Sequence, residues 1–300
     1  MNKADSKSIV KLAVKFLLSG TALYFVFQIV DPQSIFKAVL SANLIYFFLA
    51  ILAFNLSKIV SSFRLNLFYR AAGVYLTERY NLLLYYIGMF YNLFLPGSVG
   101  GDTYKVILLK QQRMGSTKTL FMATLLDRVN GLALLVFLTC GLMLLRDNVY
   151  QAPYFHTLAW LGFILTIPCY WLCTRLAFKN FMGVLWSTLH LSLWVQLGQL
   201  LSAYLILMAL GVNMGHLDYL ILFMASSVVA VLPFTIGGVG AREMVFLYGY
   251  QFLQIREDMA VAFSFLFFST LTLSSLIGLA LSFLPIPSPS NPTITQTLEG

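Results

Sequence analysis

The chain has 300 residues, of which 59% are hydrophobic and only 10% are charged, and its mean hydropathy is +0.83. This composition excludes a soluble domain and predicts an integral membrane protein. The formal charge of +8 does not indicate binding to nucleic acid, because the basic residues lie between the apolar segments instead of on one surface. No metal site or cofactor is predicted, since the three cysteines have no further ligands nearby in sequence.

The apolar segments predict several membrane-spanning helices, each of which needs about 20 residues. Residues 1–8 are expected to form a cytoplasmic tail, 9–284 an integral membrane domain, and 285–300 a disordered tail rich in proline and serine. The predicted full spans are 9–29, 44–63, 117–145, 154–174, 185–210 and 260–284. The segment 64–79 carries arginines among aromatic residues, so we expect a helix that lies on the membrane surface there.

Two apolar segments, 80–95 and 217–232, are short for a span, and both end in the pattern L-P-x-x-x-G-G. Proline lacks an amide donor and paired glycine is very permissive, so a helix should break at each copy. Inside a bilayer such a break survives only within protein or beside a water-filled cavity. The pattern therefore predicts two re-entrant hairpins around a binding site. The residues of the breaks are Pro96, Gly97, Gly100 and Gly101 in the first copy and Pro233, Gly237, Gly238 and Gly240 in the second.

The distribution of basic residues predicts the orientation of the chain. With a cytoplasmic N-terminus, 13 of the 19 basic residues fall on the cytoplasmic side, as the positive-inside rule requires. Three full spans then separate the two hairpins, so the hairpins enter the membrane from opposite faces. The predicted fold is an all-α, polytopic membrane helix bundle with two inverted repeats, each containing a re-entrant hairpin.

Six charged residues near the breaks or within a span are the candidate substrate-binding residues. Asp127 and Arg128 lie about 15 Å into their span at 1.5 Å per residue. At this depth the two residues either have a role in function or form a structural ion pair that holds this helix to a break. The others are Asp102, Lys105, Arg242 and Glu243. The charges of all except Lys105 sum to minus one, which does not select a substrate, although a guanidinium binds phosphate well.

Two polar stripes recur at helical spacing within the spans. The first is Asn55, Lys58, Ser62 and Asn66. We expect this face to look inward, with Lys58 either inside or reaching to the membrane interface. The second is Thr188, Ser192, Gln196 and Gln199. The sequence leaves two roles open for this stripe, hydrogen bonds between helices and contacts with a substrate.

Three motifs together resemble the lysylphosphatidylglycerol synthase transmembrane, or flippase-like, family. They are L-P-G-x-x-G-G-D at 95–102, L-D-R at 126–128 and P-x-x-x-G-G-x-G-x-R-E at 233–243. The resemblance covers about 9–284 and implies movement of a lipid headgroup across the cytoplasmic membrane of a bacterium or archaeon. The soluble aminoacyl-transfer domain of two-part members is not found here, so we expect a transporter more than an enzyme. Stand-alone relatives are associated with polyprenyl-linked sugar or hopanoid pathways, which leaves phospholipid and glycolipid substrates open.

The leading hypothesis is therefore a lipid flippase or scramblase that needs no cofactor and no catalytic residue. One alternative is a membrane-embedded transferase for lipid-linked donors, with Asp102 or Asp127 as base and an arginine on the phosphate. Another is a non-catalytic membrane partner of a glycosyltransferase or lipid synthetase. A homodimer is also open, because small residues lie on the spans.

Overall fold

The computed structural model describes residues 32–283, apart from 95–99, 147–152, 232–240 and 254. The predicted tails, the span 9–29, most residues of the two breaks and the side chain of Glu243 lie outside this part. The described residues form helices and turns with no strand among them, which confirms the all-α prediction. The helices are α2 (Pro32–Leu40), α3 (Leu44–Ala71), α4 (Glu78–Phe94), α5 (Gly100–Gln111), α6 (Thr117–Leu144), α7 (Pro153–Ala177), the 3-10 helix η1 (Lys179–Val184), α8 (Leu185–Ala209), α9 (His216–Val231), α10 (Ala241–Leu253) and α11 (Glu257–Ser282).

Five of the described helical segments are long and apolar enough to cross a membrane. They are Leu44–Ala71, Thr117–Leu144, Phe155–Ala177, Lys179–Ala209 and Asp258–Ser282. These segments confirm the predicted spans after the first. The starting points of α3 and α6 follow from local chemistry, because the Asn43 side chain accepts from the Ile45 amide at 3.0 Å and Ser116 Oγ accepts from the Thr119 amide at 3.1 Å.

The prediction of a surface helix over 64–79 is wrong. Residues 64–71 continue α3 for two further turns, and Arg64, Phe68 and Tyr69 are buried there. The Asn66 side chain donates to the carbonyl of Leu76 at 3.2 Å and so holds the following turn against the helix. Residues 64–71 do not lie on the membrane surface, because their aromatic side chains pack into the bundle and the arginine pairs with a carboxylate inside the protein.

Two further observations concern the predicted topology. The connection after the first span contains a short helix, α2, which packs against α11. Arg64 and Lys105, counted above among cytoplasmic residues, are buried within the bundle. Eleven of the 19 basic residues then remain on the cytoplasmic side, so the predicted orientation keeps its basis in the sequence.

Each of the two short apolar segments is the first arm of a helical hairpin. Helix α4 packs against α5, and α9 packs against α10. At 1.5 Å per residue α5 is only about 18 Å long, well short of a bilayer core of about 30 Å. The arms of the first hairpin touch backbone to backbone, because a Cβ built on Gly101 would overlap the carbonyl of Gly88.

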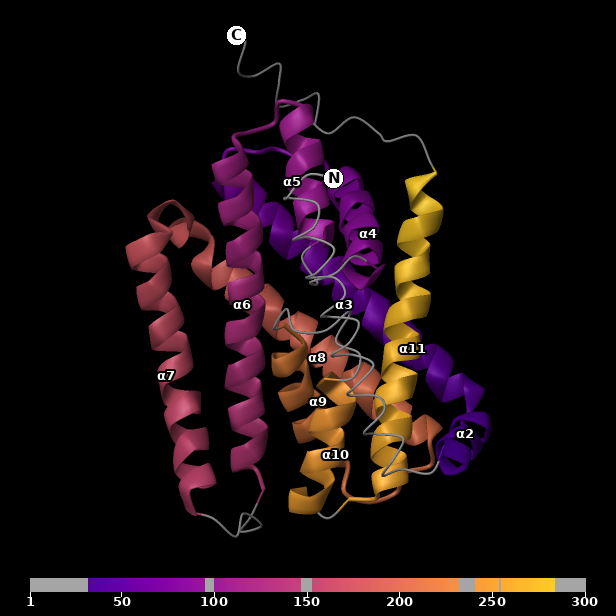
Figure 1. The fold of residues 1–300 in the computed structure, drawn as a ribbon. Helices are drawn as coiled ribbons and strands as arrows, with labels where there is room; N and C mark the ends of the chain where they lie inside the picture. The colour runs from indigo at the N-terminus through magenta and orange to yellow at the C-terminus, as the bar shows by residue number, and fades with distance from the viewer. Residues whose placement is uncertain (1–31, 95–99, 147–152, 232–240, 254, 284–300) are drawn as a thin grey trace, which may run out of the picture.

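The outer ends of the two hairpins lie at opposite ends of α6, which is about 42 Å long at 1.5 Å per residue. The outer end of the first hairpin, where the Tyr80 hydroxyl meets Gln112, lies just before α6 begins. Beyond the other end of α6, Arg146 pairs with Asp218 in the first turn of α9. Figure 1 shows α4 and α5 in the upper half of the molecule and α9 and α10 in the lower half.

The packing partners in one half of the chain recur in the other half. Helix α4 packs against α5 and α11, and α9 packs against α10 and α6. Helix α5 packs against α6, and α10 against α11, while α3 and α8 cross each other with the most extensive contact in the bundle. Exchanging α3–α6 with α8–α11 therefore leaves this pattern unchanged, as an internal repeat requires.

Candidate functional site

A cavity of about 310 Å³ lies where the two hairpins meet. Asn92 and Asp102, on either side of the first interruption, line it together with Val231 and Arg242, on either side of the second. The long helices α3, α6, α8 and α11 supply the remaining walls. Segments that are more than a hundred residues apart in the chain thus share one polar space.

The described charges around this cavity are predominantly positive. Its basic residues are Lys58, Arg64, Lys105, Arg128 and Arg242, and its acidic residues are Asp102 and Asp127. Among these described side chains the positive charges exceed the negative ones by three. The sum of minus one drawn from the sequence left out the first three of the basic residues, and it included Glu243, whose side chain is not described.

Asp102 forms an ionic centre in the first turn of α5. It is 8% exposed, and one carboxylate oxygen accepts from Lys105 Nζ at 3.0 Å. The other oxygen accepts from Nε of Arg128 on α6. This contact ties the first hairpin to α6, as the structural alternative for Arg128 foresaw, but the partner of Arg128 is Asp102 and not the adjacent Asp127.

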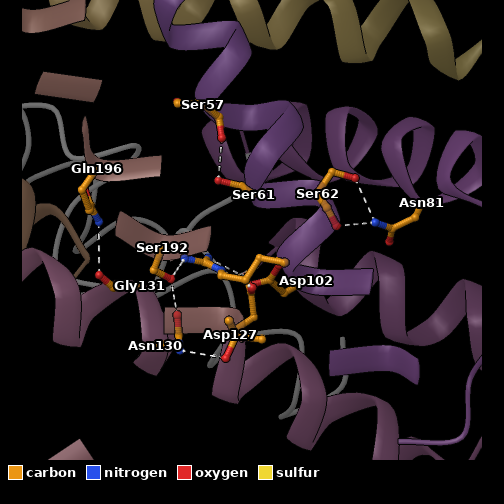
Figure 2. Close-up of polar contacts among 12 residues, drawn as sticks. Ser57, Ser61, Ser62, Asn81, Asp102, Asp127, Asn130, Gly131, Ser192 and Gln196 are labelled. Carbon is orange, nitrogen blue, oxygen red and sulfur yellow. Dashed lines mark hydrogen bonds and ion pairs between the residues drawn. The ribbon is translucent and has the colours of Figure 1, made fainter. Parts of the chain in front are cut away.

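Asp127 belongs to a second ionic centre that joins three helices. Arg64 on α3 donates from Nε at 2.7 Å and from Nη2 at 3.1 Å to the two oxygens of Asp127. Its Nη1 donates to Ser192 Oγ on α8 at 2.7 Å, and the Ser192 hydroxyl bonds to Asn130. Figure 2 shows Asp127, Asn130 and Ser192 close together. The side chains of Arg64 and Asp127 are only 6% and 11% exposed, so the pair is buried.

Arg64 is the charged residue of this site that the sequence analysis missed. Ending the span at residue 63 placed it on a surface segment. The signal was present in the spacing, because Ser57, Ser61 and Arg64 follow one another at four and three residues and so share a helix face. Ser57 and Ser61 are buried on that face.

The remaining two cations of the cavity lie over aromatic rings. The guanidinium of Arg242 is 4.8 Å from the ring centre of Phe267 and 5.8 Å from that of Phe223. The ammonium of Lys58 is 4.4 Å from the ring centre of Phe54. Lys58 therefore faces the cavity, and the alternative that it reaches to the membrane interface is wrong.

The polar stripe on α8 forms hydrogen bonds between helices, as one of the two alternatives predicted, and it also reaches the cavity. Thr188 and Ser192 bond to Asn130 on α6, so this part joins two helices. Gln196 donates to the carbonyl of Gly131 at 3.2 Å (Figure 2). Like Gln199, it lines the cavity. The stripe thus leads from a structural network into the cavity wall.

Replacing Ser192 by alanine should destabilise the protein by about 1.5–3 kcal/mol, because Arg64 loses a charge-assisted hydrogen bond. Ser226 provides the matched control, since it is equally buried but its hydroxyl bonds to a carbonyl of its own helix. Thermal unfolding in detergent measures both variants. An equal drop in melting temperature for Ser192→Ala and Ser226→Ala would contradict a special role for Ser192.

Helices long enough to cross a membrane around a buried, charged cavity define a polytopic membrane protein with an internal polar site. The chain belongs to the family of the lysylphosphatidylglycerol synthase TM region, whose family model matches residues 12–182 and 172–278. This match confirms the family that the three motifs indicated. No curated protein and no solved structure matches the chain.

Proposed function

We propose that the protein is a lipid translocase, a flippase or scramblase that passes a lipid headgroup through the cavity while the acyl chains stay in the bilayer. The observation that carries this proposal is the shared cavity, which residues from both sides of both interruptions line. Broken helices that meet at one polar site are typical of transporters with inverted repeats. An excess of basic side chains around the cavity suits the phosphate of a phospholipid or polyprenyl-linked glycolipid.

The inverted relation of the two halves belongs to the same proposal. The hairpins reach the cavity from opposite ends of α6, and the packing partners of α3–α6 recur in α8–α11. Two such halves allow one side of the cavity to open while the other closes. Re-entry of each hairpin from its own face of the membrane would give a headgroup access from either leaflet.

The contacts favour translocation over transfer chemistry. A transferase would need Asp102 or Asp127 as a base, yet each carboxylate is held by cations in a buried ion pair. Both oxygens of each carboxylate already accept hydrogen bonds from cations, so neither carboxylate is free to take a proton from a substrate. The arrangement therefore supports binding and passage of the headgroup.

Purified protein in liposomes tests the proposal. Fluorescently labelled phosphatidylglycerol or polyprenyl phosphate in the inner leaflet should become accessible to a membrane-impermeant quencher with the wild-type protein. It should stay protected with Arg242→Ala, because this variant removes a cavity cation at the second hairpin. Arg256→Ala is the control, since this arginine is exposed and pairs with Asp258 at the start of α11.

Other results would select the other functions. Equal quenching in protein-containing and empty liposomes, over several lipids, would contradict translocation and favour a membrane partner of another enzyme. Chemical conversion of the labelled lipid, detected by chromatography, would favour the transferase.

A further inference from the structure

Lys58 lies outside the ion pairs that engage the two carboxylates of the cavity, and we propose that a phosphate group of the lipid binds between Lys58 and Arg242. The inference rests on the proposed function in one respect, namely that the phosphate belongs to a transported lipid. Its location rests on the contacts of the two hairpins and of α3.

The two hairpins hold a cation in the same way. Lys105, in the second arm of the first hairpin, lies 4.8 Å from the ring centre of Tyr85 in the first arm. Arg242 occupies the corresponding place in the second repeat of the motif, and it lies 5.8 Å from the ring centre of Phe223 in the first arm of its own hairpin. Each hairpin therefore carries one cation over an aromatic ring.

The anions of the two hairpins differ. Asp102 accepts from Lys105 in the first hairpin, and the matching position of the second repeat is occupied by Val239 in the sequence. The ion pairs of the cavity include Arg64–Asp127, Lys105–Asp102 and Arg128–Asp102. Lys58 takes part in none of these pairs. The carboxylates of α5 and α6 are thus engaged by other cations, whereas Lys58 faces the cavity outside these pairs.

Lys58 and Arg242 lie on one continuous group of aromatic rings. The ring of Phe267 is 5.7 Å from that of Phe54 and 4.6 Å from that of Phe223. Lys58 lies over Phe54, and Arg242 lies over Phe267. Aromatic faces hold cations in place without neutralising their charge. Both cations also line the same cavity.

The chemistry of this pair points to a phosphate. A guanidinium offers a planar pair of donors to phosphate oxygens, and an ammonium adds a compact charge. Gln196 and Gln199 line the same cavity and can bond to the sugar or glycerol part of a headgroup. Since Asp102 and Asp127 are already engaged, we assign the ligand as an anionic phosphate ester, with the remaining ion pairs serving as anchors of the helices.

Binding of dodecyl phosphate to the purified full chain in maltoside detergent tests this site. Native mass spectrometry should show dodecyl phosphate bound to the wild type. Lys58→Gln should weaken this binding at least about tenfold, which corresponds to about 1.4 kcal/mol, and Lys58→Arg should restore most of it. Lys179→Gln, at an exposed lysine of η1, should bind like the wild type. Inorganic phosphate at the same concentration should bind far more weakly, because it lacks the alkyl chain.

Several outcomes would overturn the inference. Wild-type binding by a Lys58→Gln variant that elutes as a folded species would remove the site, and Lys58→Met provides a second variant should the first fail to fold. Equal binding of inorganic phosphate would assign the site to a free ion instead of a lipid. Lys58-dependent binding of dodecyl phosphate without any lipid exposure in the liposome assay would contradict translocation while leaving the phosphate site in place.

Discussion

Asp127→Ala should destabilise the protein by about 3–5 kcal/mol, the usual cost of leaving one partner of a buried ion pair alone. Arg64 would then retain its charge among α3, α6 and α8 with Ser192 as its remaining described hydrogen-bond partner. Thermal unfolding in detergent, followed by size-exclusion chromatography, measures the loss. This is among the largest effects that we expect from any single polar substitution in the chain.

A double variant separates charge from packing at this position, and a variant of an exposed ion pair serves as its comparison. Arg64→Met combined with Asp127→Leu removes both charges and should recover much of the lost stability, because no buried charge is left unpaired. Asp258→Ala should cost no more than about 1 kcal/mol, since its partner Arg256 is 70% exposed. A double variant as unstable as Asp127→Ala alone would show that this site depends on shape and not on charge.

Gly101→Ala should separate the two arms of the first hairpin. A single added methyl group would overlap the backbone carbonyl of Gly88, and a backbone cannot move aside as a flexible side chain can. Overpacking of this kind commonly costs 1–3 kcal/mol, and a backbone clash belongs at or above the upper end of that range, about 3 kcal/mol. Lipid exposure in liposomes should fall together with the melting temperature, because Asp102 follows directly in the sequence.

Gly183→Ala is the matched control for this substitution. Nothing lies within 4 Å of a Cβ built on Gly183, so the variant should fold and transport like the wild type. A Gly101→Ala protein with unchanged melting temperature and transport would mean that α4 and α5 do not need this close approach.

Much of the fold follows from the sequence because apolar length and helix caps are local signals. The predicted segments beginning at residues 44, 117 and 185 start at the first residues of α3, α6 and α8. The place where α3 ends could not be predicted in the same way. Its last two turns contain Arg64 and Asn66, and only the contacts with Asp127 and Leu76 in other segments make their burial favourable.

The sequence predicts which charged residues line the candidate site better than it predicts which of them form ion pairs with each other. Asp102, Lys105, Asp127, Arg128 and Arg242 all line the cavity, as their positions near breaks or within a span suggested. Adjacent Asp127 and Arg128 face different partners, since neighbouring residues on a helix point about 100° apart. Which carboxylate meets which cation depends on how helices pack, and no spacing within one segment carries that information.

The ionic centre at Arg64 also sets an order for the biogenesis of the protein. Arg64 is synthesised 63 residues before Asp127 and 128 residues before Ser192. When α3 leaves the ribosome, its arginine has neither partner, and a lone arginine in a membrane-spanning helix is unfavourable, by as much as about 2.5–3.5 kcal/mol at a helix centre on insertion scales. Lateral release of α3 from the insertion machinery into lipid should therefore wait until α6 has emerged, so that the two helices enter the membrane as a pair.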